Sequence, residues 1–580
     1  MEETRNCQNC KNDFTIEPDD FAFYDKIGVP APTFCPECRL QRRLVWRNEK
    51  GLFKRKCDAP GHEETIVSIY SPEEDVIVYD NEYWNSDAWD PMNSGFEYDF
   101  SVSFFKQFRK LLSTTPVMAL FDSKGVNNSY CNITVGHKNC YLVSAGWDNE
   151  DCMYSNRISY CKDTVDSYAC HKTEFSYGNV FCKDSNKVFY SRECESCTDS
   201  YFLYDCRSCI NCIGCTNLRN KSYCIFNKQY TKEEYQNFIK ENNLSDRITL
   251  NFIKDNFNKL YLNSIHRYAH LLKTENVIGD NVENSQNCFW CFDLAGEAQN
   301  VKYCNWGTYG LKDSYDTGPG TGGKSELTYE GISIGVQNNK CAFGVIIWNC
   351  QEVYYSFWMQ NCSNCFGCVG LKNKSYCIFN KQYSKEDYFE IINKIKKHMD
   401  DMPYVDKVGR IYKYGEYFPI ELSPFAYNYS VSMDYMPITK NEADINGYPW
   451  RDKTLNDYKI TISYDTLPNT ISEVQDSILN EVINCINSEN EECTKAFKIT
   501  KKELDFYRHI NIPIPQKCYS CRHSERLKLR NPMKLWHRSC MCDLPNHEHT
   551  GQCEVEFETT YAPDRPEKVY CEKCYQQEVI

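Results

Sequence analysis

Short apolar groups separated by polar residues dominate the middle of the chain and predict strands. Between residues 121 and 230, Tyr, Phe, Val and Ile occur in groups of two or three, and Asn, Asp, Ser or Gly interrupts each group. Each cysteine of this block is three, nine or twelve positions from the next, and adding neighbouring intervals mostly gives coils of about 18 to 24 residues. This pattern is typical of a parallel β-solenoid, in which each coil covers the one below. We therefore expect a column of stacked cysteines along its core.

A second block, residues 276–383, is a diverged copy of the first. Residues 218–235 and 371–388 are identical at 15 of 18 positions. In each copy a capping box follows, with Thr231 and Glu234 in one and Ser384 and Asp387 in the other, and this motif predicts the start of a helix. Because the open end of a solenoid needs a cover, we expect these helices to be the caps.

The two ends of the chain are also copies of each other. Residues 10–57 and 493–540 align without a gap and are identical at 18 of 48 positions, cysteines included. The C-terminal copy opens a predicted helix with the capping box of Thr500 and Glu503. The predicted fold is thus mostly β with helical caps: two cysteine-rich parallel β-solenoid blocks flanked by duplicated zinc-binding modules of the treble-clef or zinc-ribbon type. The predicted segments are an N-terminal zinc module (1–85), a connector (86–120), solenoid block 1 (121–230), a helical insert (231–275), solenoid block 2 (276–383), a helical connector (384–484) and a C-terminal zinc module (485–580).

Composition and charge narrow the functional classes. The 580 residues are 41% hydrophobic and 14% aromatic, which predicts several folded domains rather than disorder. No run of about 18 apolar residues occurs, so we expect neither a membrane span nor a signal peptide, and we place the protein in the cytoplasm. In that reducing compartment the 36 cysteines are better explained as metal ligands or small buried side chains than as disulfides. The net charge of −14 disfavours nucleic-acid binding over the whole surface.

The N-terminal module carries the clearest metal motif. Cys7 and Cys10, followed by Cys35 and Cys38, form two Cys-x-x-Cys pairs whose four thiolates can surround a tetrahedral zinc ion. In the C-terminal copy Asn490 stands where Cys7 would fall, which leaves Cys493, Cys518 and Cys521. There we expect a weakened or lost metal, unless a neighbouring residue completes the site.

In the second half of the modules, the C-terminal copy and not the N-terminal one has the larger set of cysteines. For the C-terminal metal we predict the ligands Cys540, Cys542, Cys571 and Cys574, with Cys553 as the first substitute and with His547 and His549 nearby. In the N-terminal copy Asp80 and Tyr83 stand where Cys571 and Cys574 would be, so we expect one sound zinc site at each end. Cysteine-rich sets leave no open coordination position, which favours structural zinc and a protein that is not an enzyme.

A run of arginines follows Cys38, and two interpretations stay open for it. Arg39, Arg42, Arg43 and Arg47 lie at helical or near-helical spacing beside Trp46, where guanidinium groups could grip phosphates while the indole stacks on a base. The other interpretation is a charged face that pairs within the protein, and it is favoured because most charge runs have no ligand.

Two further motifs suggest chemistry but fit packing better. Cys206, Cys209, Cys212 and Cys215 are spaced like iron–sulfur ligands, yet the second block has Met359 in place of the first of them, as expected of core filling. Zinc binding by these four thiols stays as a third alternative. Residues 318–325 match the phosphate-loop pattern, but the residues before them are polar and those after them alternate like a strand, so we expect a glycine-rich turn.

The distinctive runs, taken together, resemble a group of proteins. Cys7-Gln-Asn-Cys10, residues 34–49, the two copies of Asn-Lys-Ser-Tyr-Cys-Ile-Phe-Asn-Lys-Gln-Tyr and residues 570–575 resemble large, cysteine-rich, zinc-ribbon-containing hypothetical proteins encoded by uncultivated bacteria of reduced genome. The resemblance covers nearly the whole chain and implies the architecture, but it implies no activity. Our leading hypothesis is a zinc-binding scaffold for a protein partner, with nucleic acid as a further partner of the basic terminal modules. The alternative is a metal-handling or iron–sulfur redox protein that uses the clustered thiols.

Overall fold

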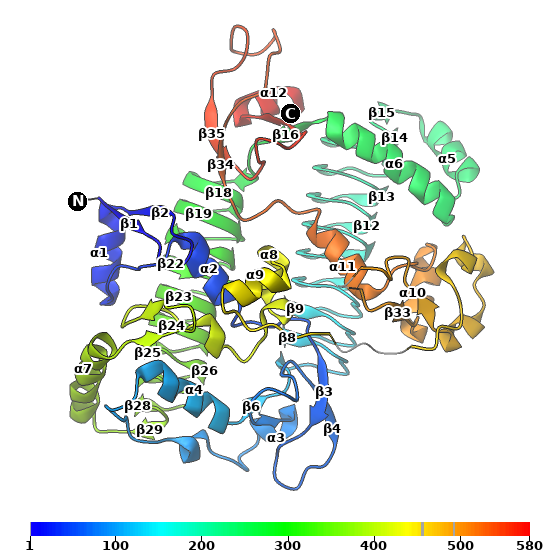
Figure 1. Cartoon of the computed structure of the whole chain (residues 1–580). Helices are drawn as coiled ribbons and strands as arrows, with labels where there is room; N and C mark the ends of the chain where they lie inside the picture. Colours follow the sequence, from blue (N-terminus) through cyan, green and yellow to red (C-terminus); the bar gives the residue numbers. More distant parts are fainter. Residues whose placement is uncertain (1, 454–457, 491–492, 580) are drawn as a thin grey trace.

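Two stacks of parallel strands, side by side, form the centre of the molecule (Figure 1). The computed structural model describes residues 2–453, 458–490 and 493–579, and this part of the chain is mixed α/β. We call the stacks the first ladder (residues 122–229) and the second ladder (residues 271–382). The chain climbs the first ladder from the bottom of Figure 1 to the top and descends the second, so the two stacking directions oppose each other.

The first ladder repeats at a short and constant step. Lys162 pairs with Glu174, Glu174 with Asn186 and Asn186 with Thr198, all in parallel, so each strand lies twelve positions after the strand with which it pairs. Isolated bridges extend this register along the block, and the longer coil expected from the cysteine spacing is therefore wrong. The strands are β7 (Asp122–Ser123), β8 (Asn132–Val135), β9 (Ser144–Trp147), β10 (Lys162–Val165), β11 (Glu174–Tyr177), β12 (Asn186–Phe189), β13 (Thr198–Tyr201), β14 (Cys224–Ile225) and β15 (Lys228–Gln229).

The repeat is short because the backbone turns at every third residue. Tyr154, Arg157 and Tyr160 have φ angles of 53°, 57° and 56°, in the left-handed region, and the same spacing continues through the block. Turns this close together leave room inside for small side chains, and buried cysteines fill the core. Their thiols donate to backbone carbonyls, as from Cys152 Sγ to the carbonyl of Cys161 at 3.4 Å. Cysteine suits this core because it is small, soft and a weak donor.

The second ladder follows the same plan with slightly longer steps. Gln286 pairs with Gln299, a step of thirteen positions, and Gln351 pairs with Ser363, a step of twelve. Cysteines fill its core as well. Its strands are β17 (Leu271–Leu272), β18 (Glu275–Glu283), β19 (Gln286–Leu294), β20 (Gln299–Lys302), β21 (Asn305–Gly307), β22 (Lys312–Thr317), β23 (Glu326–Gly335), β24 (Asn339–Trp348), β25 (Gln351–Tyr354), β26 (Phe357–Gln360), β27 (Ser363–Phe366), β28 (Ser375–Ile378) and β29 (Lys381–Gln382).

Helices follow the last strands of both ladders. The capping box of Thr231 and Glu234 is formed at the start of α5 (Lys232–Glu241), and Ser384 caps α7 (Lys385–Asp401). The next helix, α6 (Arg247–Asn263), packs Phe257 near Phe202, and α7 packs against the last strands of the second ladder. These helices therefore pack along the flank of the final strands, and the expectation that they cover the open ends stays a prediction.

The remaining elements build the two terminal modules and their connectors. The N-terminal elements are β1 (Glu3–Asn6), β2 (Asp13–Ile16), α1 (Pro18–Ile27), α2 (Pro36–Leu44), β3 (Phe53–Lys56), β4 (Thr65–Ser68), β5 (Val78–Tyr79), α3 (Asn81–Asn85), α4 (Phe104–Thr114) and β6 (Val117–Met118). The others are β16 (Ile265–Arg267), β30 (Tyr404–Val405), β31 (Ile411–Tyr412), α8 (Val431–Tyr435), α9 (Lys440–Ile445), β32 (Ile483–Asn484), β33 (Ala496–Phe497), α10 (Lys501–Ile510), α11 (Tyr519–Leu527), β34 (Trp536–Ser539), β35 (Glu556–Thr559), β36 (Lys568–Tyr570) and α12 (Glu572–Val579).

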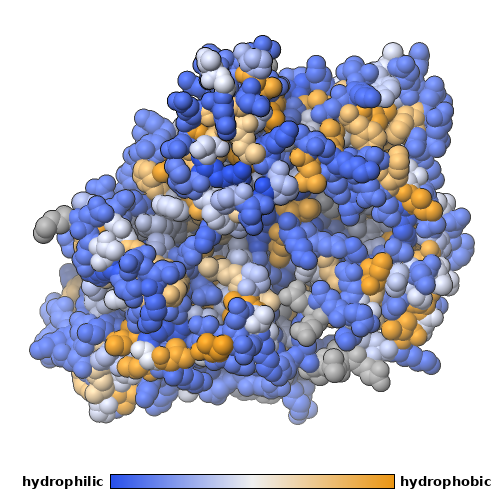
Figure 2. All heavy atoms as spheres, turned by 45° about the horizontal axis from the view of Figure 1, so that its top comes forward, coloured by the Kyte–Doolittle hydropathy of each residue, from blue (hydrophilic) through white to orange (hydrophobic). Residues whose placement is uncertain are grey.

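The visible surface is mainly polar, with apolar residues in small separate groups (Figure 2). The larger exposed apolar side chains include Val405, Val408 and Ile411, which lie in and between β30 and β31. Among the described helices, none has the length and hydropathy needed to cross a membrane.

Candidate metal centres

The first cysteine group joins the turn after β1 to the start of α2. The thiols of Cys7, Cys10, Cys35 and Cys38 all lie within 4.8 Å of one another, as the two Cys-x-x-Cys pairs predict. The backbone N–H of Cys35 donates to Cys7 Sγ at 3.2 Å, and the Asn9 side chain donates to Cys38 Sγ at 3.2 Å. Hydrogen bonds from the Cys35 and Cys38 thiols hold the pKa of Cys7 well below its usual range. These hydrogen bonds favour a thiolate, the form that binds a metal, at Cys7, whereas the hydrogen bonds with Cys38 and Cys7 raise the pKa of Cys35.

The second group lies in the first half of the C-terminal module and contains four thiols, not three. Cys485, Cys493, Cys518 and Cys521 lie within 4.8 Å of one another, and all are buried. The N–H of Cys518 donates to Cys485 Sγ at 3.3 Å, which repeats the bond from Cys35 to Cys7. A hydrogen bond from Cys485 lowers the pKa of Cys518 to about 4. Cys485 therefore occupies the place of Cys7, and the expectation of an incomplete site is corrected.

The third group lies in the second half of the C-terminal module. Cys540, Cys553, Cys571 and Cys574 lie within 4.8 Å of one another. The predicted set has Cys542 instead of Cys553, so the group contains the substitute. The N–H of Cys571 donates to Cys540 Sγ at 3.2 Å, as the first residue of the helix pair does in the other two groups.

Cys542 belongs to a neighbouring group with His547, His549 and Cys574. Cys542 Sγ lies 3.1 Å from His547 Nδ1, and His547 Nε2 lies 3.0 Å from the carboxylate of Glu578. A carboxylate on the far nitrogen orients an imidazole as metal sites require. Because Cys574 is common to both groups, its thiolate would bridge the ions if both groups were filled.

The ladder cysteines are arranged differently. Among the described residues, Cys206, Cys209, Cys212 and Cys215 form no group of metal-ligand dimensions. All four are fully buried, and Cys206 and Cys215 donate to the carbonyls of Tyr204 and Cys224 at 3.5 Å each. Thiols engaged with backbone carbonyls in a closed core serve packing rather than cluster ligation.

The predicted nucleic-acid arginines are inside the protein. Arg39, Arg42, Arg43 and Arg47 are each between 0% and 3% exposed. Arg39 Nη2 and Arg43 Nη1 hold the two carboxylate oxygens of Asp316 at 2.9 and 3.1 Å, and Asp316 lies on β22 of the second ladder. The nucleic-acid interpretation of these residues is therefore wrong, because their charges are paired and out of reach of a phosphate.

The other two arginines of the run are paired in the same way. Arg42 contacts Glu330 of β23 at 2.8 Å and Glu416 at 2.7 Å, and Arg47 contacts Glu49 at 2.7 Å. Burial alone would lower the pKa of Arg42, but the two carboxylates more than offset this and raise it. Arg42 thus joins Arg39 and Arg43 on the face that α2 docks against the second ladder, whereas Arg47 follows the helix and pairs with Glu49.

The C-terminal module repeats this docking on the first ladder. Arg522 Nε and Arg526 Nη1 hold the carboxylate oxygens of Asp166 at 2.7 and 2.9 Å. Arg522 and Arg526 are the aligned counterparts of Arg39 and Arg43. Each module therefore clamps a different ladder through one buried aspartate.

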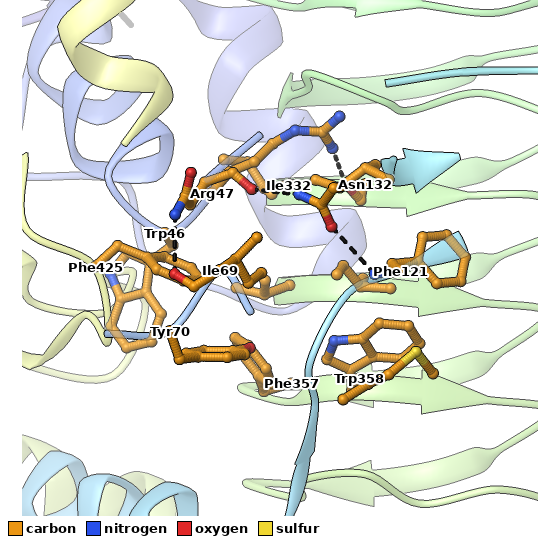
Figure 3. A pocket seen from close by; sticks show the side chains of 16 residues that line it. Trp46, Arg47, Ile69, Tyr70, Phe121, Asn132, Ile332, Phe357, Trp358 and Phe425 are labelled. Carbon is orange, nitrogen blue, oxygen red and sulfur yellow. Dashed lines mark hydrogen bonds between the residues drawn. The ribbon is translucent and has the colours of Figure 1, made fainter. Parts of the chain in front are cut away.

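A cavity lies where the N-terminal module meets both ladders (Figure 3). Asn132 of β8 donates to the carbonyl of Asn48 at 3.0 Å and accepts from the N–H of Phe121 at 3.1 Å. Among the described residues that line the cavity, Arg47 alone is charged, and Glu49 neutralises it. The walls are otherwise mostly apolar and aromatic, Trp358 among them, so the cavity is a packing seam with no group poised for catalysis.

The glycine-rich loop, residues 318–325, connects β22 to β23. A phosphate loop opens a helix whose N-terminus holds the phosphates, whereas this loop enters a strand. It is a turn of the second ladder, as expected.

A scan against protein-family models and a search of curated proteins both found no match to the chain.

Proposed function

We propose that the chain is a non-enzymatic, zinc-stabilised scaffold for a protein partner. The observation that carries this proposal is the closure of three groups of four cysteines, in which every thiol except that of Cys10 belongs to a buried residue. Four thiolates complete a tetrahedral zinc shell and leave no position for a substrate. Such sites contribute folding free energy rather than catalysis.

The position of the groups supports a structural role. The first group holds the start of α2, which carries Arg39 and Arg43 to the second ladder, and the second group holds α11, which carries Arg522 and Arg526 to the first. A metal at each group would fix the helix that clamps a ladder. Zinc therefore acts here on the assembly of the whole molecule.

The ladders supply the surface for a partner. We interpret both as β-solenoids, whose regular coils display side chains at fixed intervals on an extended face. On the first ladder Lys138 and Glu150 are adjacent members of one exposed column, 2.9 Å apart. A protein partner fits this surface better than nucleic acid, because the net charge is −14 and the arginine run is buried.

Elemental analysis with an absorption spectrum tests the proposal on untagged protein purified without oxygen. We expect zinc at about three ions per chain that survive dialysis against a mild chelator, one for each closed group, and no visible absorption. Iron with sulfide and a broad visible band would refute the scaffold and support the metal-handling or redox alternative.

A further inference from the structure

The second half of the N-terminal module has the same fold as the part of the C-terminal module that holds the third cysteine group. β3 pairs with β4 in antiparallel fashion as β34 pairs with β35. Cys57 follows β3 as Cys540 follows β34, and the N–H of Asp80 donates to Cys57 Sγ at 3.3 Å as that of Cys571 donates to Cys540 Sγ at 3.2 Å. The two backbones therefore build the same corner around the same first thiol.

Backbone hydrogen bonds give the residue equivalences across this corner. The N–H of Cys57 donates to the carbonyl of Glu64, and that of Cys540 donates to the carbonyl of Val555. His62 and Cys553 each lie two positions before that acceptor, so they occupy equivalent places.

The end of the corner is equivalent as well. The residue after Cys57 donates to the carbonyl of Val78, and the residue after Cys540 donates to that of Val569. By this register Asp80 stands for Cys571 and Tyr83 for Cys574. Three of the four thiol places thus carry residues that ligate metals: a cysteine, a histidine and an aspartate.

The side chains of this corner converge on one point. Ligand atoms of Cys57, His62, Glu64 and Asp80 all lie within 4.8 Å of one another. Asp80 Oδ2 lies 3.4 Å from Cys57 Sγ and 3.3 Å from His62 Nδ1, and Glu64 Oε1 lies 2.7 Å from the same nitrogen. The Tyr83 ring, in the place of the fourth thiol, packs edge-on against His62 with 5.0 Å between ring centroids. Glu64, and not Tyr83, therefore supplies the fourth ligand atom of this group.

We propose that Cys57, His62 and Asp80 bind a divalent transition-metal ion such as Zn(II) or Co(II), with Glu64 as the fourth ligand. A thiolate with an imidazole selects these ions over magnesium and calcium. The Glu64 side chain is 50% exposed, so water or an external ligand can take its place, and the ion exchanges faster than one held by four buried thiols. This site goes beyond the three cysteine groups and does not depend on what they hold.

Titration with Co(II) tests the site in the full-length protein. The protein is first dialysed against a mild chelator and its zinc is counted, and Co(II) is then added while its thiolate charge-transfer absorption is recorded. The variant is His62→Ala, and the matched control is His537→Ala, because His537 is likewise paired with a glutamate, Glu558, at 2.9 Å. We expect wild type and the control to take up one Co(II) more than His62→Ala.

A second variant, His62→Cys, separates loss of the ligand from misfolding of His62→Ala. His62→Cys places a thiol where the C-terminal copy has Cys553, so we expect it to retain the ion and to show stronger charge-transfer absorption. Equal uptake by wild type and His62→Ala would overturn the proposal and leave a surface His–Glu pair beside a buried cysteine. A low zinc count before titration would instead contradict the three structural sites, and the difference between wild type and His62→Ala would still report on this one.

Discussion

The clamp between α2 and the second ladder predicts a large and local loss of stability when Asp316 is changed to Asn. Asp316 is fully buried, and its two oxygens hold Arg39 and Arg43, which are 1% and 0% exposed. The variant keeps the size of the side chain but leaves two buried guanidinium groups facing an amide. Arg43 has few other interactions to compensate for the lost carboxylate, because its Nε and Nη2 have no hydrogen-bond partner among the described residues.

The expected cost follows from the burial of the pair. Removing one partner of a buried ion pair costs about 3–5 kcal/mol, because the remaining charge stays desolvated. The same change in an exposed pair costs less than about 1 kcal/mol. The matched control is therefore Glu150→Gln, whose carboxylate pairs with Lys138 at 2.9 Å while the two side chains are 39% and 55% exposed.

Urea unfolding measures the loss, and amide hydrogen exchange locates it. We expect Asp316→Asn to lower the free energy of unfolding by about 3–5 kcal/mol and to speed exchange in α2 while exchange in α11 stays unchanged. Adding Arg43→Met to Asp316→Asn should recover part of the loss, because it removes one of the stranded charges. If Asp316→Asn costs no more than Glu150→Gln, the clamp does not hold the module and the reasoning fails.

Three other predictions follow from the cysteines and the buried histidine. Cys485→Ala should lose one zinc ion by elemental analysis whereas Asn490→Ala should keep all of them; equal counts would contradict the role of Cys485. Cys209→Ala should leave the metal content unchanged and lower the free energy of unfolding by about 1 kcal/mol, and a lost metal would revive cluster ligation. Burial lowers the pKa of His137 from 6.5 to about 4. Between these pH values the imidazole binds a proton in the unfolded chain but not in the folded protein, so the free energy of unfolding falls as the pH falls from 6.5 to 4. His137→Gln should flatten this part of the curve by up to about 3 kcal/mol, as urea unfolding at several pH values would measure; parallel curves would contradict it.

The elements that the sequence predicts correctly rest on local patterns. The capping boxes at Thr231 and Thr500 both form, because the motif needs only residues three apart. The length of the ladder repeat was predicted wrongly, although many of the cysteines are twelve positions apart, which is the observed step. What the sequence did not indicate is the left-handed backbone at residues such as Tyr154 and Arg157, which turn rules do not associate with that conformation.

The metal groups show the same division. Cys7, Cys10, Cys35 and Cys38 are recognisable because each pair lies within one turn. An alignment without gaps does not match Cys485 to Cys7, because more residues separate Cys485 from Cys493 than separate Cys7 from Cys10. The N-terminal corner at Cys57 looks incomplete in the sequence because three of its four thiols are absent, and only the backbone equivalence shows that His62 stands in the place of one.

The arginines show why side-chain type alone misleads. Arg43 and Asp316 are 273 residues apart, and Arg526 and Asp166 are 360 apart, so no local pattern links them. Yet the duplication holds the information: Arg39 and Arg43 recur as Arg522 and Arg526, and a nucleic-acid contact at one end gives no reason for both copies to keep them. A clamp does, because each copy has its own ladder and its own buried aspartate. The N-terminal module holds the second ladder and the C-terminal module holds the first, so each end of the chain is fixed to the ladder that lies farther from it in the sequence.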